Sequence, residues 1–176
     1  MKDYAKAILY IYHGIDGVVS QIDDLVLRRA LASFSDSTSC EKQAERIIGY
    51  IEQKKLLLAL RCKTEAALSS FTEEEVKYFE YKYFKRKPAG YFVGFDAAGR
   101  NYFRKQIRLL EKFCFALARQ GIDEESFRRD YLQMEFIRDL VRRIRRSEEK
   151  AAALGRARAA AAKRGEKKVQ RYSLSL

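Results

Sequence analysis

The sequence has few of the residues that mark tight turns, disulfide frameworks or metal sites. Its 176 residues include one proline, nine glycines, three cysteines and one histidine, and tryptophan is absent. The alternation of apolar and polar residues that is typical of strands is nearly absent, whereas Ala, Leu, Glu, Lys and Arg, the strong helix formers, are abundant. This composition predicts an all-α protein.

Cysteine and histidine are too sparse for the usual catalytic or metal-binding patterns. Cys40, Cys62 and Cys114 match neither a zinc spacing nor a disulfide framework, so we predict free, buried thiols in a reducing compartment. His13 stands alone, which makes a histidine-based triad or metal site hard to build. No glycine-rich phosphate loop follows a strand. We therefore predict that the protein is not an enzyme and uses no cofactor or metal.

The chain also lacks a long apolar run. It begins Met-Lys-Asp-Tyr, unlike a secretory signal, and no segment approaches the length of a membrane span. A cytoplasmic protein without a membrane partner is predicted. The formal net charge of +12 and the isoelectric point near 9.7 favour an anionic partner, and nucleic acid more than a lipid surface.

The N-terminal third predicts an antiparallel helical hairpin, because only a short turn at 33–39 separates two long helices. Thr38 and Glu41 form a capping box at the second helix, which we place at about Cys40–Leu68. Gly14 and Gly17 mark a bend in the first helix, over residues 2–33. The first helix has a heptad-like apolar seam, formed by Tyr4, Ile8, Ile11, Ile15, Val18, Ile22 and Leu25. The residues of the second helix that can pack along this seam are Ala44, Ile47, Ile48, Ile51, Leu58 and Cys62. A second copy of the chain is the alternative partner for this seam.

The stretch Ser70–Ala118 predicts two further helices around a glycine-rich joint. Thr72 and Glu75 form a capping box, and Phe71 can pack on Val76 as a hydrophobic staple. Pro88 ends this helix, and Asp96 can cap the next. The core-facing residues are predicted to be Val76, Phe79 and Tyr83 in the first helix and Phe103, Ile107, Leu110, Cys114 and Leu117 in the second.

The second of these helices has a basic face. It carries Arg100, Arg104, Lys105, Arg108 and Lys112. With Asn101, the first turns hold the residue types that contact guanine, adenine and phosphate. The alternative is an ordinary solvated face of a bundle helix.

Three segments here resemble a known family. Thr72-Glu-Glu-Glu-Val76, Tyr83-Phe84-Lys85 and Leu109-Leu-Glu-Lys-Phe113 resemble the fourth conserved region of bacterial RNA polymerase sigma factors, and equally the related helix-turn-helix of phage and mobile-element regulators. The resemblance implies that the basic helix enters the major groove of promoter DNA. By position, the reading surface would be Arg100, Asn101, Arg104, Lys105 and Arg108.

The joint departs from the family pattern. Ala89–Phe95, with Gly90 and Gly94, replaces the usual supporting helix. Its aromatic residues, Tyr91, Phe92 and Phe95, either fill a small core or stack on bases. The sigma segment that melts promoter DNA has no counterpart, so an independent sigma factor is not predicted.

The C-terminal part starts with a glycine stop at Gly121 and a cap at Asp123. One or two helices follow, with a break near Leu132. They have an apolar face and a strongly basic end, and this end either contacts phosphates or is simply solvated. The apolar face is Phe127, Tyr131, Phe136, Ile137, Leu140, Val141 and Ile144, and the basic end is Arg138, Arg142, Arg143, Arg145 and Arg146. From Ser147 we predict a disordered basic tail, because it has too few large apolar residues to fold alone. Its alanine-rich part can form a frayed helix.

These patterns predict four parts: a helical hairpin at 1–68, a helix-turn-helix at 69–120, a helical segment at 121–146 and a tail at 147–176. The predicted function is a DNA-binding transcription regulator of bacterial, phage or mobile-element origin. The reading residues would be Arg100, Asn101, Arg104, Lys105, Arg108 and Lys112. The alternative is a protein-interaction module that binds RNA polymerase or a sigma factor without reading DNA, and an RNA-binding role is a third hypothesis.

Overall fold

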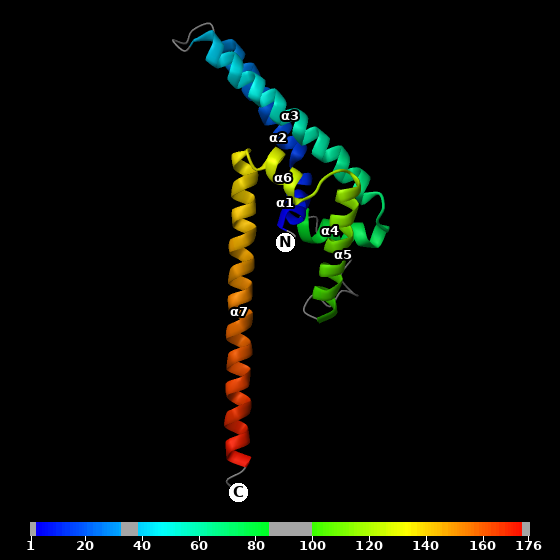
Figure 1. Cartoon of the computed structure of the whole chain (residues 1–176), viewed down its shortest axis with the longest axis vertical. Helices are drawn as coiled ribbons and strands as arrows, with labels where there is room; N and C mark the ends of the chain where they lie inside the picture. The colour runs from blue at the N-terminus through cyan, green and yellow to red at the C-terminus, as the bar shows by residue number, and fades with distance from the viewer. Residues whose placement is uncertain (1–2, 33–38, 85–99, 174–176) are drawn as a thin grey trace.

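The computed structural model describes residues 3–32, 39–84 and 100–173, and within these ranges the regular structure is entirely helical. The predicted all-α class is therefore confirmed. The helices are α1 (Asp3–Tyr12), α2 (Ile15–Ala32), α3 (Cys40–Leu68), α4 (Glu73–Tyr83), α5 (Arg100–Arg119), α6 (Glu124–Tyr131) and α7 (Glu135–Ser173). The α2–α3 hairpin and α7 project in opposite directions from a central body (Figure 1).

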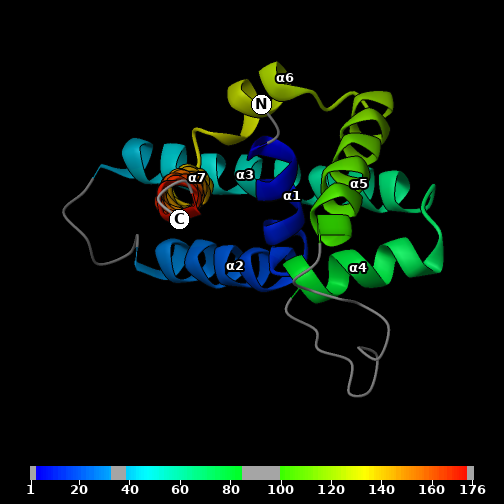
Figure 2. The same ribbon diagram turned by 90° about the horizontal axis from the view of Figure 1, so that it is seen from below.

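The short helix α1 lies at the centre of that body. It contacts α3, α4, α5 and α7 and is surrounded by them in the end-on view of Figure 2. Ala5, Ala7, Ile8 and Leu9 are completely buried. The two alanines let neighbouring helices approach closely, while the two large side chains fill the centre of the core.

The predicted bend in the first helix is confirmed. α1 ends at Tyr12 and α2 begins at Ile15, and the Gly14 N–H closes the last turn by donating to the carbonyl oxygen of Ile11 at 2.8 Å. Beyond the bend, α2 leaves the body and pairs with α3 (Figure 1). The predicted antiparallel hairpin is also confirmed.

The face that α3 turns toward α2 differs from the predicted one. Of the predicted residues only Ile47 is partly buried, and Ala44, Ile48, Ile51, Leu58 and Cys62 are exposed. The seam instead holds polar and aromatic side chains that have partners on α2. Lys54 binds Asp23 at 2.6 Å, Arg61 pairs with Asp16, and Tyr50 lies under the Arg29 guanidinium. These pairings allow charged residues to occupy the inner face.

Local capping at α3 was also predicted one residue early. Ser39, and not Thr38, caps the helix, and its hydroxyl accepts a hydrogen bond from the Lys42 N–H at 3.4 Å. Thr38 itself lies outside the described residues. Ser39 already has the extended backbone of a cap residue, so the first helical turn starts at Cys40.

The capping box at α4 is confirmed. Glu75 N–H donates to the Thr72 hydroxyl at 3.4 Å, and Thr72 N–H donates to the Glu75 carboxylate at 3.0 Å. Phe71, just before the cap, is buried, and its ring contacts those of Phe79 and Phe113 with centroids 5.4 and 6.2 Å away. This aromatic cluster joins α4 to α5.

The apolar stripe predicted for α5 is partly wrong. Leu110 and Leu117 are buried and Cys114 is half-buried, but Ile107 is 56% exposed. The core instead receives Leu109, Phe113 and Ala116 in addition. The C-terminal half of α5 packs against α3 and α1, and its N-terminal half extends beyond the body. The buried face of α5 therefore begins at Leu109 and continues toward the C-terminal end of the helix. The side chain of Phe103 and the joint, from Lys85 to Gly99, lie outside the described part.

The signals predicted between α5 and α7 are confirmed. Gly121 has φ of +72°, which suits glycine after a helix end, and Asp123 caps α6 by accepting the Ser126 N–H at 2.7 Å. α6 ends at Tyr131 and α7 starts at Glu135, so the break falls where it was expected. Met134, which had not been predicted, is buried at this corner.

The segment from Ser147 continues α7 as a helix to Ser173. All its described side chains from Ser147 to Arg156 are exposed, consistent with a segment that buries little surface. The predicted burial of the free thiols is wrong for two of the three, because Cys40 and Cys62 are exposed and Cys114 is half-buried.

Candidate nucleic-acid interface

Two of the predicted reading residues are available for contact. Arg104 and Arg108 lie one turn apart on the part of α5 that extends beyond the body, and both are exposed. Within the described residues neither has an ion-pair partner. Their side chains are thus positioned to meet a phosphate or a base edge without breaking an ion pair inside the protein.

The other predicted reading residues are placed differently. The side chains of Arg100 and Asn101 lie outside the described part. Lys105 is half-buried and has an interaction within the chain. Lys112 binds the Glu75 carboxylate at 2.5 Å and sits 4.4 Å from the centre of the Phe71 ring. Lys112 therefore helps to fix α4 against α5.

The Lys112 pairing changes the electrostatics of the α4 cap. Burial alone would raise the pKa of Glu75, but hydrogen bonds from Lys112 and from the Thr72 N–H outweigh it and lower that pKa below its ordinary value. Glu75 thus stays ionised to lower pH in the folded protein. The predicted capping residue and the predicted DNA contact are parts of a single α4–α5 link.

A groove of about 610 Å³ opens between the projecting half of α5 and α7. One wall is formed by Gln106 and Ile107 of α5, and the other by α7 between Leu140 and Ala151. Residues of α1 and of the last turn of α4 also line it, so four helices meet here. The exposed Ile107, which does not join the core, is part of this lining.

The charges at the groove are mainly positive. Lys6, Lys82 and Arg143 line it, and Glu148 pairs with Lys6. Burial, and then the nearby charge of Lys6, lower the pKa of the Lys82 ammonium, while Glu148 acts in the opposite direction. Lys82 is half-buried, and with Lys6 and Arg143 it makes the lining more positive than negative, so an anion would be attracted to the groove.

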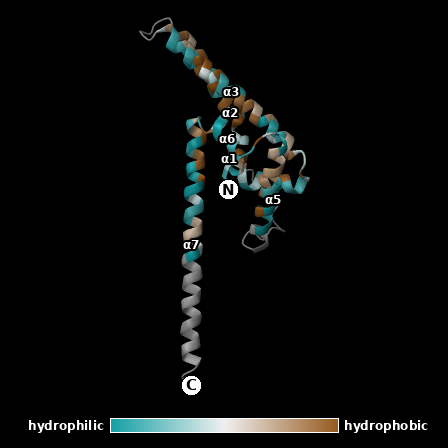
Figure 3. Ribbon diagram, viewed as in Figure 1, coloured by the Kyte–Doolittle hydropathy of each residue, from teal (hydrophilic) through white to brown (hydrophobic). Residues whose placement is uncertain are grey.

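The net charge of the whole chain is carried by the two helices that form the groove walls. α5 has six basic residues and one acidic residue, and α7 has thirteen basic and five acidic. Outside these two helices, seventeen basic and eighteen acidic residues nearly cancel. Figure 3 shows the hydrophilic character of the described part of α7. Within α7, residues 135–151, which reach the groove, carry a net charge of +2, and residues 152–173, which continue beyond the groove, carry +6.

Sequence reasoning missed Lys6 and Lys82 as members of this site. Lys6 lies on a mostly buried helix, and Lys82 lies in the last turn of α4, where a basic residue is common because it interacts favourably with the helix dipole. Only the packing of α1 against α4, α5 and α7 brings them to the same groove.

Among the described residues, no group of three or more His, Cys, Asp or Glu side chains could hold a metal ion. No described helix is long and apolar enough to cross a membrane. In comparisons with known proteins, no protein-family model, curated protein or solved structure matches this chain.

Proposed function

We propose that the protein binds duplex DNA through α5 and α7 and acts as a transcription regulator. The observation that carries this proposal is that α5 and α7 together hold the net positive charge of the chain, and that the projecting half of α5 and the first part of α7 flank a groove. Phosphate backbones attract such a surface at long range. The sigma-like resemblance of 72–113 adds the expectation that the first turns of α5 enter the major groove.

Exposed arginines on α5 support base readout in addition to phosphate contact. Arg104 and Arg108 have no ion-pair partner in the described structure, and Ile107 between them is 56% exposed and lines the groove. A projecting helix of about 10 Å diameter fits the major groove. The α4–α5 link through Lys112 and the aromatic cluster gives that helix a rigid base.

Selection from a pool of random duplexes tests the proposal. Full-length protein should enrich a defined site at about 150 mM salt. The Arg104→Ala variant should lose roughly 1–3 kcal/mol of binding and relax the preference at one position.

Arg119→Ala is the matched control, because Arg119 is exposed at the opposite end of the same helix and its removal changes the charge equally. Enrichment that is equally reduced in both variants would argue against readout by Arg104. Binding of all sequences alike would reduce the function to non-specific nucleic-acid binding.

A second function, a protein-interaction module, is favoured by one observation. Ile107 and Phe115 of α5 are 56% and 74% exposed, and an apolar residue between two reading arginines suits a protein surface better than a phosphate backbone. In this case Ile107→Ala would weaken binding to RNA polymerase or a sigma factor, and no duplex would be enriched.

A further inference from the structure

One side of α3, next to the face that meets α2, carries an apolar stripe that is exposed in the described structure. Ala44, Ile48, Ile51, Leu58 and Cys62 are all exposed, with Ile48 at 55%. With Lys55 they recur at spacings of four, three, four, three and four, the spacing of a coiled-coil seam. At 1.5 Å per residue the stripe is about 27 Å long.

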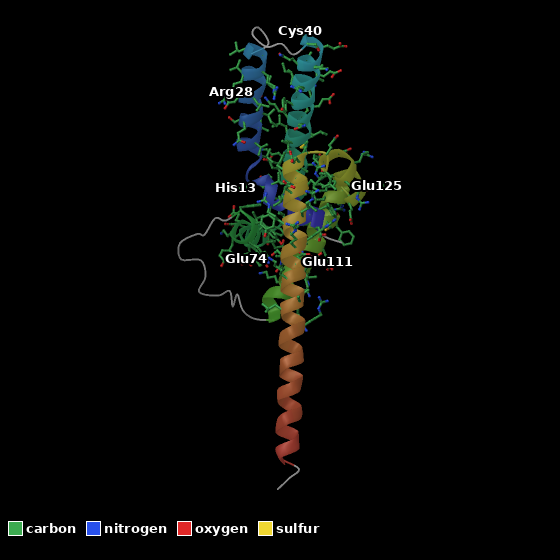
Figure 4. All side chains as sticks on the ribbon, turned by 90° about the vertical axis from the view of Figure 1, so that its left-hand side faces the viewer. His13, Arg28, Cys40, Glu74, Glu111 and Glu125 are labelled. Carbon is green, nitrogen blue, oxygen red and sulfur yellow. The ribbon has the colours of Figure 1, made fainter. Side chains whose placement is uncertain are left out.

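This stripe lies on a nearly neutral part of a strongly basic molecule. Residues 15–32 and 40–62, which form the hairpin, contain seven basic and six acidic residues. Lys54 and Arg61, on the side toward α2, are already paired with Asp23 and Asp16. The outer part of the hairpin, with Arg28 and Cys40, is far from the body that carries Glu74 and Glu111 (Figure 4). A second hairpin could approach it without electrostatic repulsion.

We infer that the α3 stripes of two copies of the chain pair antiparallel and form a symmetric dimer. A two-fold axis near residue 53 would place Ala44 opposite Cys62 of the second copy, Ile48 opposite Leu58, and Ile51 opposite Lys55. Such reciprocal contacts are what a two-fold interface requires. Because the stripe is regular and one lysine interrupts it, the same stripe of a second copy can pair with it in a single register.

The charge of Lys55 decides between the two directions of pairing. In a parallel pair, Lys55 would face the same lysine of the second copy across the seam, and the two charges would repel. In the antiparallel pair it faces Ile51 and lies beside Glu52 of the second copy, so two lysines and two glutamates surround the axis with no net charge. The antiparallel pair is therefore the complementary one.

The mass of the full-length protein in solution tests the dimer. Sedimentation at micromolar concentration should give about 41 kDa, twice the 20.5 kDa of the chain. Ile48→Glu should give a monomer with unchanged helix content, because Ile48 is exposed within one copy. Arg46→Gln, an equal change of charge two residues away on an exposed position off the stripe, should remain a dimer. A wild-type monomer, or a dimer that survives Ile48→Glu, would overturn the inference.

Cross-linking tests the direction. In a Cys40→Ser background, Ala44→Cys should form a disulfide-linked dimer under mild oxidation, because residue 44 faces Cys62 of the second copy. The same background without Ala44→Cys should not cross-link through Cys62. If Cys62 cross-links equally well without the new cysteine, the stripes are parallel and the proposed antiparallel pairing is wrong. Both readouts are independent of DNA binding.

Discussion

Lys112 and Glu75 show how one residue pair can link a local helix signal to tertiary structure. Glu75 completes the α4 capping box and also accepts the Lys112 ammonium from α5. The sequence presents Lys112 as a member of a basic face, and only the fold shows that it pairs within the chain. Its replacement should therefore weaken the fold more than it weakens DNA binding.

The stability contributed by Glu75 should depend on pH. Its pKa is lowered in the folded state, so its contribution is present above the unfolded-state pKa of about 4.3 and is lost as the pH falls through the folded-state value. At pH 7, Glu75→Gln should lower the free energy of unfolding by roughly 0.5–1 kcal/mol, because the Gln amide oxygen can still accept the Thr72 N–H and only the charged contact with Lys112 is lost.

Urea titrations of wild type and Glu75→Gln at several pH values would measure this difference. Glu74→Gln is the control, since Glu74 is exposed in the same turn and outside the capping box. The difference between wild type and Glu75→Gln should shrink in acid. A difference that stays constant from pH 7 to pH 3 would contradict the assigned role.

At the scale of elements, α5 has a buried half and a projecting half. Phe113 is completely buried in the aromatic cluster with Phe71 and Phe79, whereas Phe115, two residues later, is 74% exposed. The C-terminal half thus anchors the helix, and the N-terminal half is left free to contact a ligand.

Two alanine substitutions in α5 should therefore differ greatly. Phe113→Ala should lower the free energy of unfolding by about 3–5 kcal/mol through cavity formation, while Phe115→Ala should change it by less than about 0.5 kcal/mol. Thermal or urea denaturation of the two variants measures this contrast. Similar losses for both would mean that the buried face of α5 is assigned incorrectly.

Two glycines should respond in opposite ways to alanine. Gly121 has a positive φ of +72°, so Gly121→Ala should destabilise the protein by about 1–2 kcal/mol. Gly49 lies inside α3 with open space around it, so Gly49→Ala should stabilise by roughly 0.5–1 kcal/mol. Urea denaturation of the two variants measures both changes in the free energy of unfolding. If both variants are stabilised or both are destabilised, the assigned backbone conformation of one of the two glycines is wrong.

Element ends were easier to predict from the sequence than element faces. The caps at Thr72 and Asp123 and the stop at Gly121 depend on residues within one turn, so local patterns identify them. The inner face of α3 was missed because its charged residues are tolerated only through partners on α2, such as Asp23 for Lys54. The exposure of Ile107 and the groove beside it follow from where α7 packs, and no local pattern in α5 contains that information.

At the scale of the whole molecule, neutral and basic regions are separated. The hairpin projects one way with almost no net charge, and α7 projects the other way with most of it (Figure 1). The two proposals use different ends of the molecule: dimerisation uses the hairpin, and DNA binding uses α5 and α7. The two activities should therefore be separable by mutation.

Removal of residues 152–176, which follow the last residue lining the groove, should weaken DNA binding without changing the preferred site. The segment carries seven basic residues and one acidic residue, so it should contribute attraction to phosphates rather than base readout. The logarithm of affinity should fall less steeply with the logarithm of salt concentration, by about 0.9 for each phosphate that the shortened protein no longer neutralises. Titrations at several salt concentrations would measure the slope, and a changed site preference would instead assign base readout to this segment.

The central claim is that α5 and α7 form one surface for DNA, and the most direct measurement is the affinity of full-length variants for the selected duplex at about 150 mM salt. Arg104→Ala on α5 and Arg143→Ala on the α7 wall of the groove should each weaken binding at least about fivefold, or 1 kcal/mol. Arg119→Ala should bind like wild type. An equal loss in all three variants, or no binding by the wild-type protein, would contradict the claim.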